Sequence, residues 1–352
     1  MKRLKMSIVV LLVVMYVIGN KGIAASASSS INIAYNNQNL QLQWYINRDS
    51  LQKDPNENRM SVQNFSRYGS TNVFFLTQHY LGNTYLYRCT LGNDGYITAQ
   101  DHVILSGYGH GESVEVTGYD SSTNTYTVWV GATEGSATYY WSKDIARVKY
   151  TIDSASTTGA TITESKTITA LNGVTGSTDL SFRTSVCVAE NDNRICICTQ
   201  LDDENGDWYY IIYALSDLNT AVNGITGSSA SLSSLGVTIK SSFSMSDTGL
   251  PNASFQSIDT DGVGSNNKML FLAGGGHTDN CQVDQYLYTN GGTTTKLYEY
   301  IILNSQAPSN NFLYNAEIEG IKIYSDNGVD YIYMMFKQQN ATFSRIYRYP
   351  VQ

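Results

Sequence analysis

The sequence has 352 residues, a formal net charge of −8 at pH 7 and only 15% charged residues. An acidic chain of this kind is poorly suited to bind phosphates, so we do not expect nucleic acid as a partner. The chain is rich in Tyr (27) and Gly (29) and poor in Pro (4). Because Tyr favours strands and Gly favours tight turns, the composition predicts an all-β protein with many hairpins.

The first 27 residues have the order of a cleavable secretory signal. Three cations, Lys2, Arg3 and Lys5, precede the apolar run 8–19, and small residues follow up to Ala27. The run is shorter than the roughly 20 apolar residues of a transmembrane helix, although a membrane anchor is the alternative. We therefore predict that 1–27 is a signal peptide and that the mature chain 28–352 is secreted, without a transmembrane anchor. Cleavage would remove four cations, including Lys21, and take the formal charge from −8 to −12.

A short motif recurs five times in the mature chain. In each copy an apolar residue precedes a polar one, and a strongly apolar strand opens about ten residues later. A Tyr-rich third strand follows, and turn sequences such as Asn93-Asp94-Gly95 separate the strands. The polar members of the five copies are Gln63, Glu115, Arg183, Gln256 and Glu319.

The spacing of the copies leaves room for a fourth strand in each. The repeat therefore predicts one domain over 28–352, a five-bladed β-propeller with the five polar residues near its central channel. Residues 31–46 alternate like a strand and could complete the last blade and close the ring. A β-sandwich or an irregular barrel is the alternative architecture.

The five cysteines would allow two disulfides in an exported protein. Cys196 and Cys198 alternate within one predicted strand, so they point to the same face and would bridge each other only with distortion. We favour the interpretation that most of the cysteines are small buried strand residues. No CxxC pair with histidine partners is present, so a zinc site is not expected.

A propeller gathers the starts of its innermost strands around one axis, and polar side chains there are the candidates for ligand binding. The candidates are His110, Glu112, Glu115, Arg183, Gln256, Asp259, Asp261, Glu317 and Glu319. Paired carboxylates could serve a glycoside hydrolase as acid and base. The favoured alternative is that these side chains satisfy one another in the channel. Nothing in the sequence fixes an acid–base pair, so we assign no catalytic residue.

Residues 259–267 place Asp259 and Asp261 at alternate positions before glycines, which is typical of calcium loops. The segment lacks a third acidic ligand and a closing Glu, so we favour a polar hairpin turn and expect no metal or cofactor, with Ca²⁺ as the alternative. Hydrolase elbows, zinc-binding helices, phosphate loops and dinucleotide fingerprints are missing from the sequence. The tryptophans and tyrosines could form platforms for sugar rings, although strand packing is the favoured explanation.

Four segments follow one another along most of the mature chain: 105–116 (LSGYGHGESVEV), 143–150 (KDIARVKY), 254–261 (SFQSIDTD) and 316–323 (AEIEGIKI). In this combination the chain resembles the helveticin J family, large heat-labile bacteriocins of lactic acid bacteria. The resemblance implies an exported antibacterial protein that acts on related bacteria. The family has no established catalytic residues that could be assigned to positions of this sequence. The chain departs from the expected pattern at 181–183, where Ser-Phe-Arg stands in place of a His-Ala-Glu type start.

Two hypotheses follow. The leading one is a non-catalytic bacteriocin that recognises a cell-envelope component, such as a glycan, of related Gram-positive bacteria. The alternative is a secreted lectin-like propeller or a cell-wall glycosidase. On either hypothesis the protein is extracellular, and it could associate with the cell surface.

Overall fold

The computed structural model describes residues 28–52, 61–135, 138–174, 180–203, 205–263, 267–276, 278–289, 292, 294–338 and 343–352. The predicted signal peptide, 1–27, lies outside the described residues. The described chain is all-β apart from α1 (Leu215–Asn223) and short 3-10 helices. These short helices are η1 (Arg48–Ser50), η2 (Leu171–Val174), η3 (Glu190–Asp192), η4 (Leu232–Leu235), η5 (Asp247–Gly249), η6 (Pro251–Ala253) and η7 (Asn304–Gln306).

The strands form antiparallel units of four, joined mostly by hairpins; the exceptions are the last strand of the third unit, which follows α1, and the last strand of the final unit, which comes from the N-terminal part of the chain. The first unit is β3 (Val62–Arg67), β4 (Val73–Tyr80), β5 (Asn83–Leu91) and β6 (Tyr96–Leu105). The second is β7 (Val114–Asp120), β8 (Thr125–Glu134), β9 (Ser142–Ile152) and β10 (Ala160–Thr169). The third is β11 (Ser181–Ala189), β12 (Arg194–Leu201), β13 (Trp208–Ala214) and β15 (Ser241–Met245).

The remaining units come from the C-terminal part of the chain. The fourth unit is β16 (Ser257–Val263), β17 (Asn267–Gly274), β18 (Cys281–Thr289) and β19 (Thr294–Leu303). The last unit is β20 (Ala316–Asp326), β21 (Val329–Gln338), β22 (Phe343–Pro350) and β2 (Gln41–Asn47). Two outer strands are added in parallel pairing, β1 (Ser29–Ala34) beside β19 and β14 (Ser229–Ser231) beside β10.

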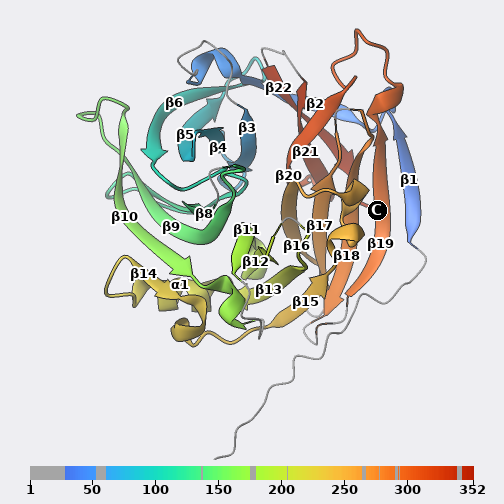
Figure 1. Ribbon diagram of the computed structural model, residues 1–352. Coiled ribbons are helices and arrows are strands. Elements are labelled where there is room, and N and C mark those ends of the chain that lie inside the picture. Colours follow the sequence, from blue (N-terminus) through green and yellow to red (C-terminus); the bar gives the residue numbers. More distant parts are fainter. Residues whose placement is uncertain are drawn as a thin grey trace, which may run out of the picture.

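The first strand of each unit lies nearest the centre, and these innermost strands contact one another in a closed ring. β3 contacts β7, β7 contacts β11, β11 contacts β16, β16 contacts β20, and β20 contacts β3. Figure 1 shows the sheets arranged around this common centre. The all-β propeller predicted from the repeat is therefore confirmed as the fold.

The number of blades is a separate question. Hydrogen bonding joins the strands into four sheets, because β2 pairs with β6 at Tyr45–Tyr96 and Ile46–Ile97 and fuses the last and first units into one eight-stranded sheet. A count of five blades requires dividing this sheet at the short β2–β6 contact. That count stays a prediction.

The N-terminal segment 31–46 is divided between two sheets. Residues up to Ala34 belong to β1, and a turn closed by the Asn37 N–H to the Ala34 carbonyl (2.9 Å) leads into β2. β2 then pairs antiparallel with β22 and lies between the last and first units. The sequence alternation runs through both strands and does not reveal the turn.

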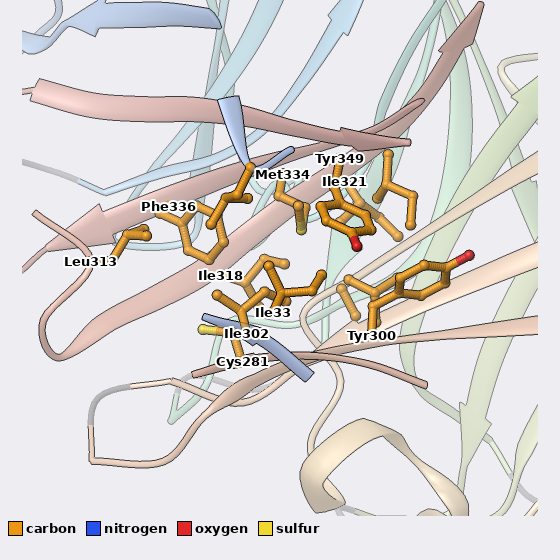
Figure 2. Close-up of a cluster of buried hydrophobic side chains, with 14 of the residues drawn as sticks. Ile33, Cys281, Tyr300, Ile302, Leu313, Ile318, Ile321, Met334, Phe336 and Tyr349 are labelled. Carbon is orange, nitrogen blue, oxygen red and sulfur yellow. The ribbon is translucent and has the colours of Figure 1, made fainter. Parts of the chain in front are cut away.

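Apolar side chains fill the spaces between neighbouring units. The cluster between the fourth and last units is the one in Figure 2, which shows side chains from both units meeting, among them Tyr300, Ile302, Ile318 and Met334. The other clusters likewise join adjacent units. Since each fully buried large apolar side chain contributes about 1.5–3 kcal/mol, unit-on-unit packing is the main source of cohesion.

All five cysteines are among the described residues, and each is a buried free thiol inside these clusters or beside them. This agrees with the packing interpretation. Within the described residues, no helix combines the length and the apolar character needed to cross a bilayer.

Candidate functional site

Two cavities lie at the two ends of the innermost strands. One, of about 550 Å³, lies where β3, β16 and β20 begin, and we call it the strand-start cavity. It is lined by Ser61, Gln63, His79, Tyr80, Leu81, His110, Tyr140, Trp141, Gln256, Glu317, Glu319 and Lys337. The other, of about 410 Å³, lies where the same strands end and is called the strand-end cavity.

One side of the strand-start cavity is aromatic, and its residues come from the first two units. The rings of His79 and His110 stack with centroids 4.5 Å apart, and Trp141 packs 4.4 Å from His110. Tyr140 lies 5.3 Å from His79. Burial lowers the pKa of His79 to about 4 and that of His110 to about 3, so both imidazoles are neutral at neutral pH.

The opposite side is polar, and most of it comes from the fourth and last units. Gln256 donates a hydrogen bond to Glu317 Oε1 (2.9 Å), while Lys337 Nζ lies 3.0 Å from Glu319 Oε1 and 3.8 Å from Glu317 Oε2. Burial raises the pKa of Glu319 to about 7 even though Lys337 opposes the shift. One carboxyl group here therefore titrates near neutral pH.

Arg183 and Glu112 form a buried ion pair behind the aromatic side. The Arg183 guanidinium donates to both Glu112 oxygens, with Nε 2.8 Å from Oε2, and also to the Phe255 carbonyl (2.7 Å). It lies 3.9 Å from the ring centre of Trp141. Such bidentate and cation–π contacts fix the orientation of the Trp141 ring.

The strand-end cavity contains a buried triad of ionisable side chains. Lys322 forms an ion pair with Glu115, and its Nζ lies 3.8 Å from Asp259 Oδ1. Asp259 Oδ2 accepts a hydrogen bond from the Ile323 N–H (2.6 Å), and the Ser66 hydroxyl donates to Glu115 (3.4 Å). Burial raises the pKa of Asp259 to about 8 and also raises that of Glu115. The triad thus links β7, β16 and β20 across the channel.

The predicted candidates thus divide between two places. His110, Gln256, Glu317 and Glu319 line the strand-start cavity, with the Glu112–Arg183 pair close behind it. Glu115, Asp259 and Asp261 line the strand-end cavity instead.

Position along the strand is the reason for this division, since Gln256 precedes β16 whereas Asp259 and Asp261 lie within it. Bulges affect instead which face a side chain takes. The pairing of β20 with β21 shifts between Ile318 and Gly320, so side chains beyond Glu319 change face. Lys322 consequently points into the channel, although strict alternation places it on the face opposite Glu319. β3, β7 and β11 have similar shifts in pairing register, and no turn residue in the sequence predicts them.

Sequence reasoning missed His79, Tyr140 and Lys337 as members of the site. Lys337 ends an apolar strand, and His79 lies near a hairpin turn, so each has the appearance of an ordinary surface residue. Trp141 was noted only among the possible sugar platforms. The sequence alone does not show which strand ends lie together at the central axis.

The segment 259–267, for which a calcium loop was the alternative to a polar hairpin turn, is not a loop at its acidic end. Asp259 and Asp261 lie within β16, and the charge that faces Asp259 is the Lys322 ammonium. Among the described residues, no group of three or more potential ligands is placed to hold a metal ion. Residues 264–266 of the segment lie outside the described residues.

Comparison with known proteins gives one family and several structures. The family model described as "Bacteriocin helveticin-J" matches residues 34–352. A search of curated proteins found no match. The tail fibre of Staphylococcus aureus phage P68 is similar in structure, with a TM-score of 0.53 and 14% identity, over 88% of this chain and 52% of that one. At this identity the similarity concerns the fold alone, and the chain spans about half of the tail fibre.

Two further structures are more distant. An exo-β-1,3-galactanase from Phanerochaete chrysosporium has a TM-score of 0.47 and 11% identity, over 89% of this chain and 64% of that one. The β-propeller domain of Cps50 (Swd1) from Myceliophteria thermophila has a TM-score of 0.36 and 11% identity, over 82% of this chain and 83% of that one.

Proposed function

The chain belongs to the helveticin J family, and on that premise we propose that it is a secreted, bacteriocin-like antibacterial protein. It recognises a component of the cell envelope of related Gram-positive bacteria through its strand-start cavity. The observation that carries this proposal is the make-up of that cavity, in which stacked rings face a group of buried and half-buried charged and amide side chains. Concave sites with aromatic walls and a few fixed polar groups are the usual form of a ligand site.

The rim of the cavity supports the choice of this end of the channel. Leu81 is 59% exposed and Tyr139 is 42% exposed, and Tyr139 is held nearly parallel to Trp141, at 9° with ring centres 6.0 Å apart. Leu81 and Tyr140 both have positive φ values, of 47° and 59°. Bulky residues rarely adopt this conformation, and such strain is concentrated at functional sites.

A killing assay tests the proposal. The mature chain 28–352 is spotted on lawns of a panel of Gram-positive bacteria, and we expect at least one related strain to lose viability in a dose-dependent way. The variant Tyr140→Ala should lower the potency. Tyr119→Ala is the matched control, because Tyr119 is 37% exposed at the end of β7, among the strand ends rather than at the strand-start cavity. Full viability of every strain over a wide dose range would refute the proposal.

A second candidate is a cell-wall glycosidase, which the raised pKa of Glu319 favours. A carboxylic acid that is protonated near neutral pH can donate a proton to a leaving group, and Glu317 and Glu112 are carboxylates close by. Release of reducing sugars from purified walls, abolished by Glu319→Gln, would support this activity. Wall binding without release would leave the binding function as the explanation.

A further inference from the structure

We propose that the strand-start cavity binds an uncharged pyranose unit of a wall glycan rather than an anionic wall polymer. This inference rests on the proposed function, because it names the ligand class of the same cavity. It follows from three properties of the cavity: its two chemically different walls, its balance of charges and its rigidity.

The two walls match the two kinds of surface on a pyranose ring. The C–H faces of a sugar are apolar and pack on rings such as Tyr140 and Trp141, and the ring hydroxyls both donate and accept hydrogen bonds. The opposite wall provides acceptors in Glu317 and Glu319 and a donor in Lys337. A purely apolar ligand would take water from that wall without offering it any hydrogen bond in return, which is costly.

The balance of charges disfavours a phosphate-bearing ligand. The cavity and the wall behind it hold three carboxyl groups, on Glu112, Glu317 and Glu319, and two cations, Arg183 and Lys337. Both cations already face carboxylates. These five groups carry no net positive charge whether Glu319 is ionised or protonated, and the neutral His79 and His110 add none. A phosphate group would meet carboxylates at close range without a free cation to bind it.

The walls are held in place before any ligand arrives. Arg183 is fixed to Glu112 and to the Phe255 carbonyl, and Trp141 packs against it. His110 Nδ1 lies 3.1 Å from the Tyr139 carbonyl, and His79 Nε2 accepts a hydrogen bond from the Gly82 N–H (3.2 Å). A preorganised site loses less conformational entropy on binding, which suits a ligand with weak individual contacts.

Calorimetric titration of the mature chain tests the inference with two soluble probes. Chitotetraose represents an uncharged pyranose chain, and poly(glycerol phosphate) represents an anionic wall polymer. We expect saturable binding of chitotetraose and no competition from poly(glycerol phosphate) at equal concentration of repeating units. Tyr140→Ala should weaken binding of chitotetraose about tenfold, the effect of losing one aromatic contact worth roughly 1.4 kcal/mol. Tyr119→Ala should bind like the parent, and circular dichroism with thermal melting confirms that both variants are folded.

The possible results separate this inference from the proposed function. Binding of poly(glycerol phosphate) that Tyr140→Ala weakens, or killing of bacteria without any binding of chitotetraose, overturns the uncharged-pyranose ligand and leaves the antibacterial role intact. Binding of chitotetraose that Tyr140→Ala weakens, together with full viability of all strains, supports the ligand class and overturns the antibacterial role. Equal binding by Tyr140→Ala and the parent would place the sugar elsewhere and overturn the inference.

Discussion

Lys322 is a buried charged residue whose loss should destabilise the fold strongly. It is buried against two carboxylates, Glu115 and Asp259, that come from β7 and β16. Removing one partner of a buried group of charges leaves the others without compensation and typically costs 3–5 kcal/mol, so we expect Lys322→Met to lower the free energy of unfolding by about that amount.

Urea denaturation of the mature chain checks this value. The double variant Lys322→Met/Glu115→Gln is the control, because it removes one of the uncompensated carboxylates and should recover part of the loss. If Lys322→Met alone unfolds at the same urea concentration as the parent, the triad contributes little to stability.

Glu319 makes stability depend on pH in a defined direction. Its pKa in the folded protein is about 7, above the ordinary 4.5, so the native state retains a proton that the unfolded state releases. The stabilising contribution of this proton is complete below pH 4.5 and is lost as the pH rises through 7, at up to about 1.4 kcal/mol per pH unit. Glu319→Gln should remove this part of the slope.

Melting temperatures of the parent and of Glu319→Gln between pH 4.5 and 8 measure the effect. His79 and His110 act in the opposite sense, because their lowered pKa values remove stability as the pH falls below 6.5. They are present in both proteins, so the difference between the two curves isolates Glu319. A difference that does not change with pH would contradict the raised pKa.

The turn of the β4–β5 hairpin contains a residue, Leu81, whose side chain does not favour the turn conformation. Tyr80 pairs with Asn83, so the loop has two residues, Leu81 and Gly82, with φ values of 47° and 75°. Two-residue turns of this kind prefer Asn-Gly, because a branched side chain is strained at positive φ. We expect Leu81→Asn to raise the free energy of unfolding by about 0.5–1 kcal/mol.

The same substitution should weaken binding to purified cell walls, because it removes an exposed apolar side chain from the rim of the strand-start cavity. Thermal melting and a wall pull-down on the same preparations measure the two effects. Val329, which is 44% exposed at the β20–β21 hairpin, offers the control Val329→Asn, for which no loss of wall binding is expected. Greater stability with unchanged wall binding would show that Leu81 has no role in recognition.

At the scale of elements, the sequence predicted those features that depend on local chemistry, namely the turns and the hairpins. Asn-Gly turns such as 205–206 and 327–328 and the apolar second strands indicated the hairpins, and their repetition indicated the propeller. The bulges at Gln63 and Glu319 were not predictable, because they depend on how each innermost strand fits beside its neighbours. The sequence also does not show at which end of the channel each residue lies, so the candidate site was treated as one group of residues, whereas the structure divides it between two cavities.

At the scale of the whole molecule, the ring depends on a strand from the other end of the chain. β2 completes the last unit beside β22 and touches β6 of the first unit. It buries Trp44 and Ile46 in the cluster between those units, while β1 adds Ile33 to the outer edge of the fourth unit. Loss of β1 therefore removes one buried side chain, and loss of β2 removes the closing contact itself.

N-terminal truncation should separate these two contributions. A chain that starts at residue 41 lacks β1 and also Leu40, and should lose about 3–6 kcal/mol, the value of burying Ile33 and Leu40, with its ring still closed. A chain that starts at residue 48 also lacks β2, which leaves the edges of β22 and β6 without their partner and exposes the cluster around Phe74 and Tyr333. We expect this shorter chain to aggregate or to unfold without cooperativity. Urea unfolding and size-exclusion chromatography of both chains test this, and equal stability would mean that the ring closes without β2.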